Sequence, residues 1–257
     1  MRYLTRAIIT ALFLFPLSGF ASTTNSPTTS ALTFSDNDRA AIESIIKDYL
    51  VNKHPEVLKE AYDELQRREQ NSADLKSKQA LADQKEKIFS DSNTPVGGNP
   101  QGDVTVVEFF DFQCGYCKMA EPSIEKLIND DKGVKFIYKD FPILGTASVT
   151  AAEAALASIK QNKYIAFHDA LMSRKEHLTE EVIYETAKNV GLNVEKLKKD
   201  MSDSAISKQI EKNIQLGSEV GVRGTPLFII GDKFFPGAMQ YDEMNKAVKD
   251  ARAEEKK

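Results

Sequence analysis

The sequence predicts an α/β domain that carries a helical insertion and follows an N-terminal helical segment. Three observations support this fold class. Residues 104–138 hold two apolar, strand-like runs around a helical pattern, and residues 227–253 hold a hairpin followed by a helix. Between them, residues 146–221 show only helical patterns. Ahead of the α/β part, residues 35–90 carry amphipathic helical stripes and lead into a stretch rich in turn-forming residues.

The overall composition excludes several classes of protein. The chain has 257 residues, with 34 Lys and Arg against 38 Asp and Glu, and 41% of its residues are hydrophobic. Wholesale disorder is therefore excluded, and a net charge of −4 offers no basic surface for a nucleic-acid partner. Only two cysteines occur, which excludes a scaffold built on several disulfides and a zinc site made wholly of cysteines.

The first residues have the pattern of a cleavable signal peptide over residues 1–21. Arg2 and Arg6 precede the apolar run Ala7–Leu17, and Gly19-Phe20-Ala21 offers small residues at the positions that a signal peptidase reads. The run is too short to span the roughly 30 Å of hydrocarbon in a bilayer. We expect cleavage near Ser22 and export to an oxidising compartment, where disulfides persist.

The remainder of the N-terminal region divides into three predicted parts. The composition of residues 22–34 predicts a disordered leader. Residues 91–103 are rich in Gly, Pro, Asn and Ser, which predicts a linker. Between them, residues 35–90 should be helical, with Ser35 and Asp36 as N-cap candidates and a break at His54-Pro55. The apolar positions follow helical spacing: Ile42, Ile45, Ile46, Tyr49 and Leu50 in one stripe, Leu58, Ala61, Tyr62 and Leu65 in the next. This pattern lapses over Gln66–Asp74.

The predicted α/β domain covers residues 104–257. Its expected core elements are the strand Val104–Phe110, a helix Gly115–Asn129 interrupted at Pro122, the strand Val134–Tyr138, the hairpin Leu227–Ile230 and Lys233–Phe235, and the helix Gln240–Ala253. The insertion should hold helices at Ala151–Ile159, Tyr164–Met172, Glu180–Val190, Val194–Met201 and Ile206–Leu216.

The two cysteines lie in the segment Cys114-Gly115-Tyr116-Cys117, directly after a predicted strand and at the start of a predicted helix. At a helix N-terminus, unpaired amide groups and the helix dipole stabilise a thiolate at Cys114. Cys117 falls three residues later on the same face, so the two sulfurs can meet. A low thiol pKa makes a cysteine both an available nucleophile and a good leaving group, which favours a redox-active pair.

Three other interpretations of the cysteines compete with the redox one. A zinc site would need two further ligands, and His54, His168 and His177 are scattered along the chain. A purely structural disulfide would close a loop too short to stabilise the fold appreciably. Two inert buried thiols would be unusual at a strand-to-helix turn in an exported protein.

Two segments carry a resemblance to a known family. VVEFFDFQCGYCKMAEPSIEKL and the later GVRGTPLFIIGDKFFPG resemble the DsbA-like branch of the thioredoxin superfamily of exported disulfide oxidoreductases. The resemblance covers about residues 104–253 and implies a thioredoxin fold with a helical insertion. It also implies a periplasmic protein whose only redox centre is the Cys114–Cys117 disulfide, with no metal and no other cofactor.

The resemblance assigns roles to further residues. Pro226 matches the family's cis-proline, which faces the cysteine pair, and Thr225 before it would contact substrate together with Gly115 and Tyr116. Glu108 matches the family's buried acid, which exchanges a proton with Cys117. An exposed strand edge is the alternative place for Glu108, and Lys139 is a candidate to pair with it across strands.

The family resemblance leaves the direction of the reaction open. Gly-Tyr between the cysteines and Thr225 before the proline resemble DsbC-type isomerases, whereas the helical insertion resembles the oxidase DsbA. We expect both activities, on secreted or periplasmic substrates, with a membrane redox partner that is either a quinone-linked oxidase or a thiol donor.

The N-terminal helices bear on the oligomeric state and on the alternatives to an enzyme. Residues 35–90 occupy the place of the oligomerisation segment of isomerases and of ScsC-type copper-tolerance proteins, so a homodimer is expected and a trimer is possible. Helices packed on their own catalytic domain are the alternative arrangement. The competing functions are a periplasmic holdase chaperone and a copper-binding protein of the ScsC type.

Overall fold

The computed structural model describes residues 34–254, which divide into two compact units. The first unit ends at Ala61 and the second begins at Tyr62. The predicted signal peptide, residues 1–21, and nearly all of the predicted leader, residues 22–34, lie outside the described residues. None of the described helices is long and apolar enough to cross a membrane.

The first unit begins with a capped helix. In α1, Asp36–Lys47, the Ser35 side chain accepts a hydrogen bond from the Asp38 amide, and the Asp38 carboxylate accepts one from the Ser35 amide. A π-helical turn, η1 (Asp48–Lys53), follows, and His54 separates it from α2. Ser35 is therefore the predicted N-cap, and the predicted break at His54-Pro55 is present.

The long helix α2, Pro55–Asp83, continues from the first unit into the second. The sequence pattern lapses over Gln66–Asp74, yet the helix is not interrupted there. Its exposed charged residues support it instead, because Glu64 forms ion pairs with both Arg67 and Arg68 one turn along. Helical structure thus persists where the apolar stripe does not.

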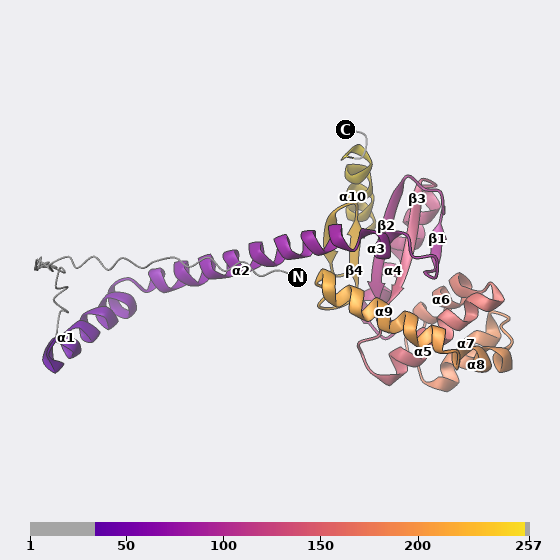
Figure 1. Cartoon of the computed structure of the whole chain (residues 1–257), viewed down its shortest axis with the longest axis horizontal. Helices are drawn as coiled ribbons and strands as arrows, with labels where there is room; N and C mark the ends of the chain where they lie inside the picture. The colour runs from indigo at the N-terminus through magenta and orange to yellow at the C-terminus, as the bar shows by residue number, and fades with distance from the viewer. Residues whose placement is uncertain (1–33, 255–257) are drawn as a thin grey trace, which may run out of the picture. The chain divides into compact units, whose positions relative to one another are not determined.

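A five-stranded sheet lies at the centre of the second unit, with the strand order β1-β3-β2-β4-β5 (Figure 1). The strands are β1 (Val96–Gly98), β2 (Val104–Phe110), β3 (Val134–Asp140), β4 (Leu227–Ile230) and β5 (Lys233–Pro236). β2 and β3 are parallel, and every other neighbouring pair is antiparallel. The central strand β2 ends directly before the two cysteines.

Helices cover both faces of this sheet. α4 (Gly115–Asp130) and α10 (Tyr241–Glu254) pack on one face together with most of the helical insertion, whereas α3 (Lys85–Phe89) and the C-terminal half of α9 (Ser204–Val220) pack on the other. The side chains of β2 alternate between these faces, so Val106 and Phe110 join the α4 core while Phe109 joins the α3 and α9 core. Glu108 follows the even-numbered set and points toward α4.

The insertion forms a helical layer beside the sheet (Figure 1). It contains α5 (Thr146–Ser158), the 3-10 turn η2 (Ile159–Gln161), α6 (Tyr164–Met172), α7 (Glu180–Asn189), α8 (Val194–Met201) and α9. These bounds agree closely with the predicted helices. The α4 helix, in contrast, runs through Pro122 without the predicted interruption, although the proline supplies no amide hydrogen for the helical bond at its position.

The range 91–103, predicted to be a linker, is part of the second unit. It contains β1, which pairs with β3, and its Gly97 packs so closely on Tyr138 that an added Cβ would lie 3.0 Å from the ring. Leu81 and Ile88 are buried in the same core as β2. The glycines that suggested a linker instead allow this close packing. The second unit begins at Tyr62, well before the predicted linker.

A buried polar cluster fastens this segment to the sheet. The Lys139 ammonium, fully buried, donates hydrogen bonds to Thr94 Oγ1 at 2.8 Å and to the Lys87 carbonyl, and lies 3.7 Å from the Asp91 carboxylate. The predicted pairing of Lys139 with Glu108 is wrong. Lys139 is in register with Phe109, so it shares the α3 face, whereas Glu108 points to the α4 face.

We predict that Asp91→Asn destabilises the second unit by about 2–3 kcal/mol, because it removes the charge that faces buried Lys139 and weakens the bonds from Gln209 and Lys212. Urea unfolding measures this change. Asp250→Asn, which removes an exposed partner of Lys246, is the matched control and should change the free energy of unfolding far less, because a solvent-exposed ion pair contributes little. Equal effects of the two substitutions would contradict the prediction.

Candidate active site at the cysteine pair and the cis-proline loop

The two cysteines lie at the N-terminal end of α4. Cys114 is the N-cap residue, and Cys117 lies in the first turn of the helix. Both are free thiols; Cys114 is 6% exposed and Cys117 is fully buried. The structure thus places the pair at the strand-to-helix turn that the sequence predicts, with one sulfur reachable from solvent and the other covered.

The surroundings of Cys114 favour its thiolate. The pKa of Cys114 is lowered to about 5, chiefly by the hydrogen bond from the Cys117 side chain. Burial opposes this effect, but the Thr225 side chain and the backbone amides of Cys117 and Tyr116 lower the pKa further. These amides are among the unpaired donors of the first helical turn.

The pKa of Cys117 moves in the opposite direction. Burial raises it most, and the hydrogen bond to Cys114 and the nearby charge of Glu108 raise it further. At neutral pH the pair therefore holds one thiolate, on Cys114, and one thiol, on Cys117. This asymmetry separates an attacking sulfur from one that must first lose a proton.

The cis-proline loop faces the cysteines. The Thr225–Pro226 peptide bond is cis, as the resemblance implies. The Cys114 thiol lies 3.1 Å from the Thr225 carbonyl oxygen and can donate a hydrogen bond to it. The Gly237 amide donates to the Pro226 carbonyl at 2.8 Å and so ties the loop to the end of β5. Residues 111 positions apart in the chain thus form one site.

Glu108 is buried beneath this site. It lies on the central strand between Tyr138 of β3 and Phe228 of β4, and it is 0% exposed. The exposed-edge alternative for Glu108 is therefore wrong. Neither carboxylate oxygen has a hydrogen-bond partner among the described residues. Burial, followed by the charges of Glu121 and Cys114, raises the Glu108 pKa well above its usual value.

Asp111 is a site residue that the sequence analysis missed. It is 1% exposed, and its carboxylate accepts hydrogen bonds from the amide of Gln113 at 2.7 Å and from the amides of Ile143 and Leu144 at 2.8 and 2.9 Å. Its carbonyl accepts from the Cys114 amide. An Asp three residues before a strand-end cysteine was the available signal, because such residues hold turns through backbone amides.

The insertion also reaches the cysteine loop. The Gln113 side chain contacts the His177 ring at 2.9 Å and accepts from the Leu178 amide, while the Lys118 ammonium donates to the Arg174 carbonyl at 2.7 Å. These contacts join residues about 60 positions apart, so the local sequence pattern does not predict them.

Exposed apolar side chains lie on the segments around Cys114. Tyr116 and Met119 on α4 are 64% and 58% exposed, and Ile143 and Leu144, held next to the loop by Asp111, are 43% and 52% exposed. A Cβ added at Gly115 would meet nothing within 4 Å. The site therefore opens onto a surface suited to an apolar part of another molecule.

A second buried cluster lies behind α4 and was not predicted. Glu121, His168 and Asp169 each offer a ligand atom, and these atoms lie within 4.8 Å of one another, a geometry that a metal ion could use. Both Glu121 oxygens lack hydrogen-bond partners among the described residues, and burial raises the Glu121 pKa to about 7. His168 Nδ1 lies 3.8 Å from a Glu121 oxygen and 3.2 Å from an Asp169 oxygen. A proton between His168 and Asp169 is therefore an alternative to a metal ion at this position.

Comparison with known families identifies the second unit. Residues 105–249 match the family model of the DSBA-like thioredoxin domain. The chain belongs to this family. Residues 38–71 separately match the N-terminal domain of the copper resistance protein ScsC. The two matches cover the catalytic unit and the start of the N-terminal helices, in the order that the sequence resemblance implies.

Solved structures and curated relatives agree with this membership. A thioredoxin-like oxidoreductase from Silicibacter pomeroyi is 41% identical, with 65% of this chain and 97% of that chain covered and a TM-score of 0.64. A linker-deletion variant of Proteus mirabilis ScsC is 28% identical, covers 88% of this chain and 100% of its own, and has a TM-score of 0.66. Disulfide bond formation protein D of Bacillus subtilis is 28% identical over 60% of this chain and 75% of its own length.

Other relatives are much longer proteins. The chain spans about a quarter, 24%, of the length of the first two curated relatives it matches, which are Na(+)/H(+) antiporters of Salinispora species. The similarity to them is confined to about 160 residues.

We predict that the reduced protein reacts with iodoacetamide at one sulfur, with a rate that rises through a midpoint near pH 5 as Cys114 ionises. Because this pKa is lowered in the fold, the thiolate also stabilises the reduced protein. That contribution is complete above the ordinary thiol pKa and is lost as the pH falls through about 5. Mass spectrometry of the alkylated protein identifies the sulfur; modification of Cys117 first would contradict the assignment.

Proposed function

We propose that the protein is an exported thiol–disulfide oxidoreductase, which forms and isomerises disulfides in secreted proteins. One observation carries the proposal: two thiols one helical turn apart have pKa values displaced in opposite directions, and the one with the lowered pKa faces the cis-proline loop. Membership of the DsbA-like family supports it. The redox centre is then the Cys114–Cys117 pair, without a further cofactor.

The proposed reaction proceeds through a mixed disulfide. The Cys114 thiolate attacks one sulfur of a substrate disulfide and expels the other as a thiolate. Cys117, after losing its proton, attacks Cys114 Sγ and releases the first substrate sulfur, so the substrate gains two electrons and the enzyme becomes a disulfide. Oxidation of a substrate dithiol is the reverse. Isomerisation requires the expelled substrate thiolate to attack elsewhere before Cys117 resolves the intermediate.

Glu108 is the residue that we propose exchanges a proton with Cys117. It shares the α4 face of the sheet with that thiol, and its charge acts on the Cys117 pKa. Because burial raises the pKa of Glu108 toward that of a thiol, a proton can pass between the two groups with a smaller energy difference than an ordinary carboxylate allows.

Export and self-association complete the proposal. The signal-peptide pattern of residues 1–21 and the membership of the DsbA-like family favour the periplasm. The first unit exposes apolar side chains, at Ile42, Ile45, Ile46, Tyr49, Val51 and Leu58. α1 and η1 bury none of their residues, so these side chains favour a homodimer or trimer built on the first unit. A membrane redox partner would reset the cysteine pair.

A second candidate function is copper binding of the ScsC type, combined with holdase activity. The match of residues 38–71 to a copper-resistance family and the presence of two free thiols favour it. Metal retained in stoichiometric amount by the reduced protein, and lost in Cys114→Ser, would support this function. Suppression of aggregation that survives Cys114→Ser would support a chaperone.

We predict that Cys114→Ser abolishes disulfide exchange on scrambled ribonuclease, since it removes the only thiolate that substrate can reach. Cys117→Ser should instead accumulate mixed disulfides on Cys114, because the resolving sulfur is absent. Non-reducing electrophoresis separates the two outcomes. Exchange that persists in Cys114→Ser would overturn the proposed enzyme.

We predict that removing residues 22–61 gives a monomer that keeps oxidase activity and loses most isomerase activity. Two catalytic units joined at one base raise the effective concentration of a weakly held substrate. The cut must stop at residue 61, because Leu81 and Ile88 belong to the core of the second unit. Sedimentation of the mature parent as a monomer, or full isomerase activity of the truncated protein, would contradict the prediction.

A further inference from the structure

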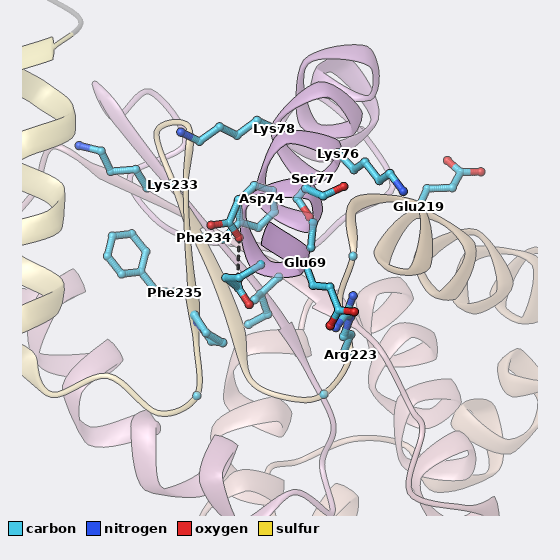
Figure 2. Close-up of a pocket in the computed structure, with 18 of the residues that line it drawn as sticks. Glu69, Asp74, Lys76, Ser77, Lys78, Glu219, Arg223, Lys233, Phe234 and Phe235 are labelled. Atoms are coloured by element: carbon cyan, nitrogen blue, oxygen red, sulfur yellow. Dashed lines mark hydrogen bonds between the residues drawn. The ribbon is translucent and has the colours of Figure 1, made fainter. Parts of the chain in front are cut away.

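A large groove in the second unit lies beside the cis-proline loop (Figure 2). Its volume is about 1280 Å³, far more than a small thiol requires. One wall is the stretch of α2 from Arg68 to Lys78, and the opposite wall is the end of α9 with the loop from Arg223 to Leu227. β5 lines the remaining side.

The wall formed by α2 is fixed by packing at the C-terminal end of that helix. Leu81 is 5% exposed and packs in one core with Val220 and Val222, at the end of α9 and just beyond it. Gly221, with a φ of +90°, ends α9 so close to α2 that an added Cβ would lie 2.7 Å from Ser77 Oγ. Because α2 is continuous, this anchorage positions the turns that precede it along the groove.

All residues of α2 from Arg68 to Lys78 except Asn71 and Leu75 line the groove. Ala73 lies about half a helical turn from those two positions, at the middle of the lining side. Ser72 and Ala73 have small side chains there, whereas Ser77 packs against Gly221. Asn71, which does not line the groove, lies on the opposite side of the helix.

The two walls do not close on each other. Among the residues the structure describes, no hydrogen bond or ion pair joins Arg68–Lys78 to the α9 end or to the cis-proline loop. Yet charges of both signs line the groove, with Glu69 and Lys76 on α2 and Glu219 and Arg223 opposite, and Lys76 points toward Glu219 (Figure 2). The groove is therefore open and offers charged groups to a ligand.

The shape of the groove identifies an extended polypeptide as its occupant. β5 is the edge strand of the sheet, so one of its sides carries no neighbouring strand. Thr225 and Pro226 line the groove, and the Thr225 carbonyl lies 3.1 Å from Cys114 Sγ. Ten residue steps of α2 extend about 15 Å, the length of four or five residues of an extended chain.

We propose that α2 forms the second wall of the substrate groove and binds the extended segment of a substrate protein that flanks its reacting cysteine. The inference rests on the proposed function and adds a substrate-binding role to a helix that also leads to the oligomerisation segment. Each catalytic unit carries its own α2 wall. The groove therefore serves substrate polypeptides and has no role in the reaction of a small thiol.

The test places a large side chain on either side of the same helix in the full mature chain. Ala73→Trp fills the groove, and Asn71→Trp adds the same bulk on the face turned away from it. Each variant is assayed with oxidised glutathione and with cysteine peptides extended by zero to six residues on either side. Sedimentation and the pH midpoint of Cys114 alkylation are measured in parallel.

We expect Ala73→Trp to lower kcat/KM at least tenfold for the longer peptides and to remove the gain in rate with peptide length. Its rate with glutathione should stay within twofold of the parent, and its sedimentation and the pH midpoint of its Cys114 alkylation should be unchanged. Asn71→Trp should resemble the parent in all of these measurements. Unchanged peptide rates in Ala73→Trp, or equal losses with glutathione and peptide, would overturn the proposed role of the groove in binding substrate. A changed oligomeric state would also overturn it, because this face of α2 would then contact a second copy of the chain. Absence of any glutathione exchange in the parent would instead overturn the proposed function.

Discussion

The hydrogen bond between the two thiols, at the N-terminal end of α4, is the interaction on which the rest of the site depends. It exists because a strand that ends at Phe110 passes through a turn held by Asp111 and enters a helix at Cys114. One sulfur is thereby placed against unpaired amides and the other inside the core. The difference between the two thiols follows from position alone, since both are the same chemical group.

Behind the pair, the protein tolerates buried carboxyl groups that would ordinarily be costly. Glu108 and Glu121 lack hydrogen-bond partners among the described side chains, and the pKa of each is raised, so protonation rather than pairing reduces the cost of burial. A core of this kind sacrifices stability around the carboxyl group that we propose exchanges a proton with Cys117. The same logic does not apply to Asp91, whose carboxylate is satisfied by Gln209 and Lys212 and stays ionised.

Much of the fold could be predicted because its signals are local. The strand Val104–Phe110 and the helices Tyr164–Met172 and Val194–Met201 have the bounds that the apolar periodicity indicates, and the cysteine pair needed only its place after a strand. The helix α2 was harder to predict, because its middle turns carry no apolar stripe. β1 was missed because Val96-Gly97-Gly98 becomes a strand only by pairing with β3.

The contacts of the site show the same limit more sharply. Asp111, Gln113 and Lys118 act through backbone groups of segments that are distant in sequence, and nothing in the spacing of residues indicates such partners. The position of Glu108 could be inferred only from a family resemblance, because a strand pattern alone does not distinguish a buried acid from an exposed one. The partner of Lys139 was wrongly assigned for a related reason: the alternation of faces depends on the register between strands.

The buried ammonium of Lys139 has a consequence for how the protein opens. Its bonds reach α3 and the loop before β1, and through Asp91 they reach α9 of the insertion. Three segments from different parts of the chain therefore share one set of polar bonds in a dry environment, where losing one bond leaves the others unsatisfied. Their backbone amides should exchange hydrogen with solvent together, as a single cooperative opening. The middle of α9 and the segment before the sheet would then belong to the same folding unit.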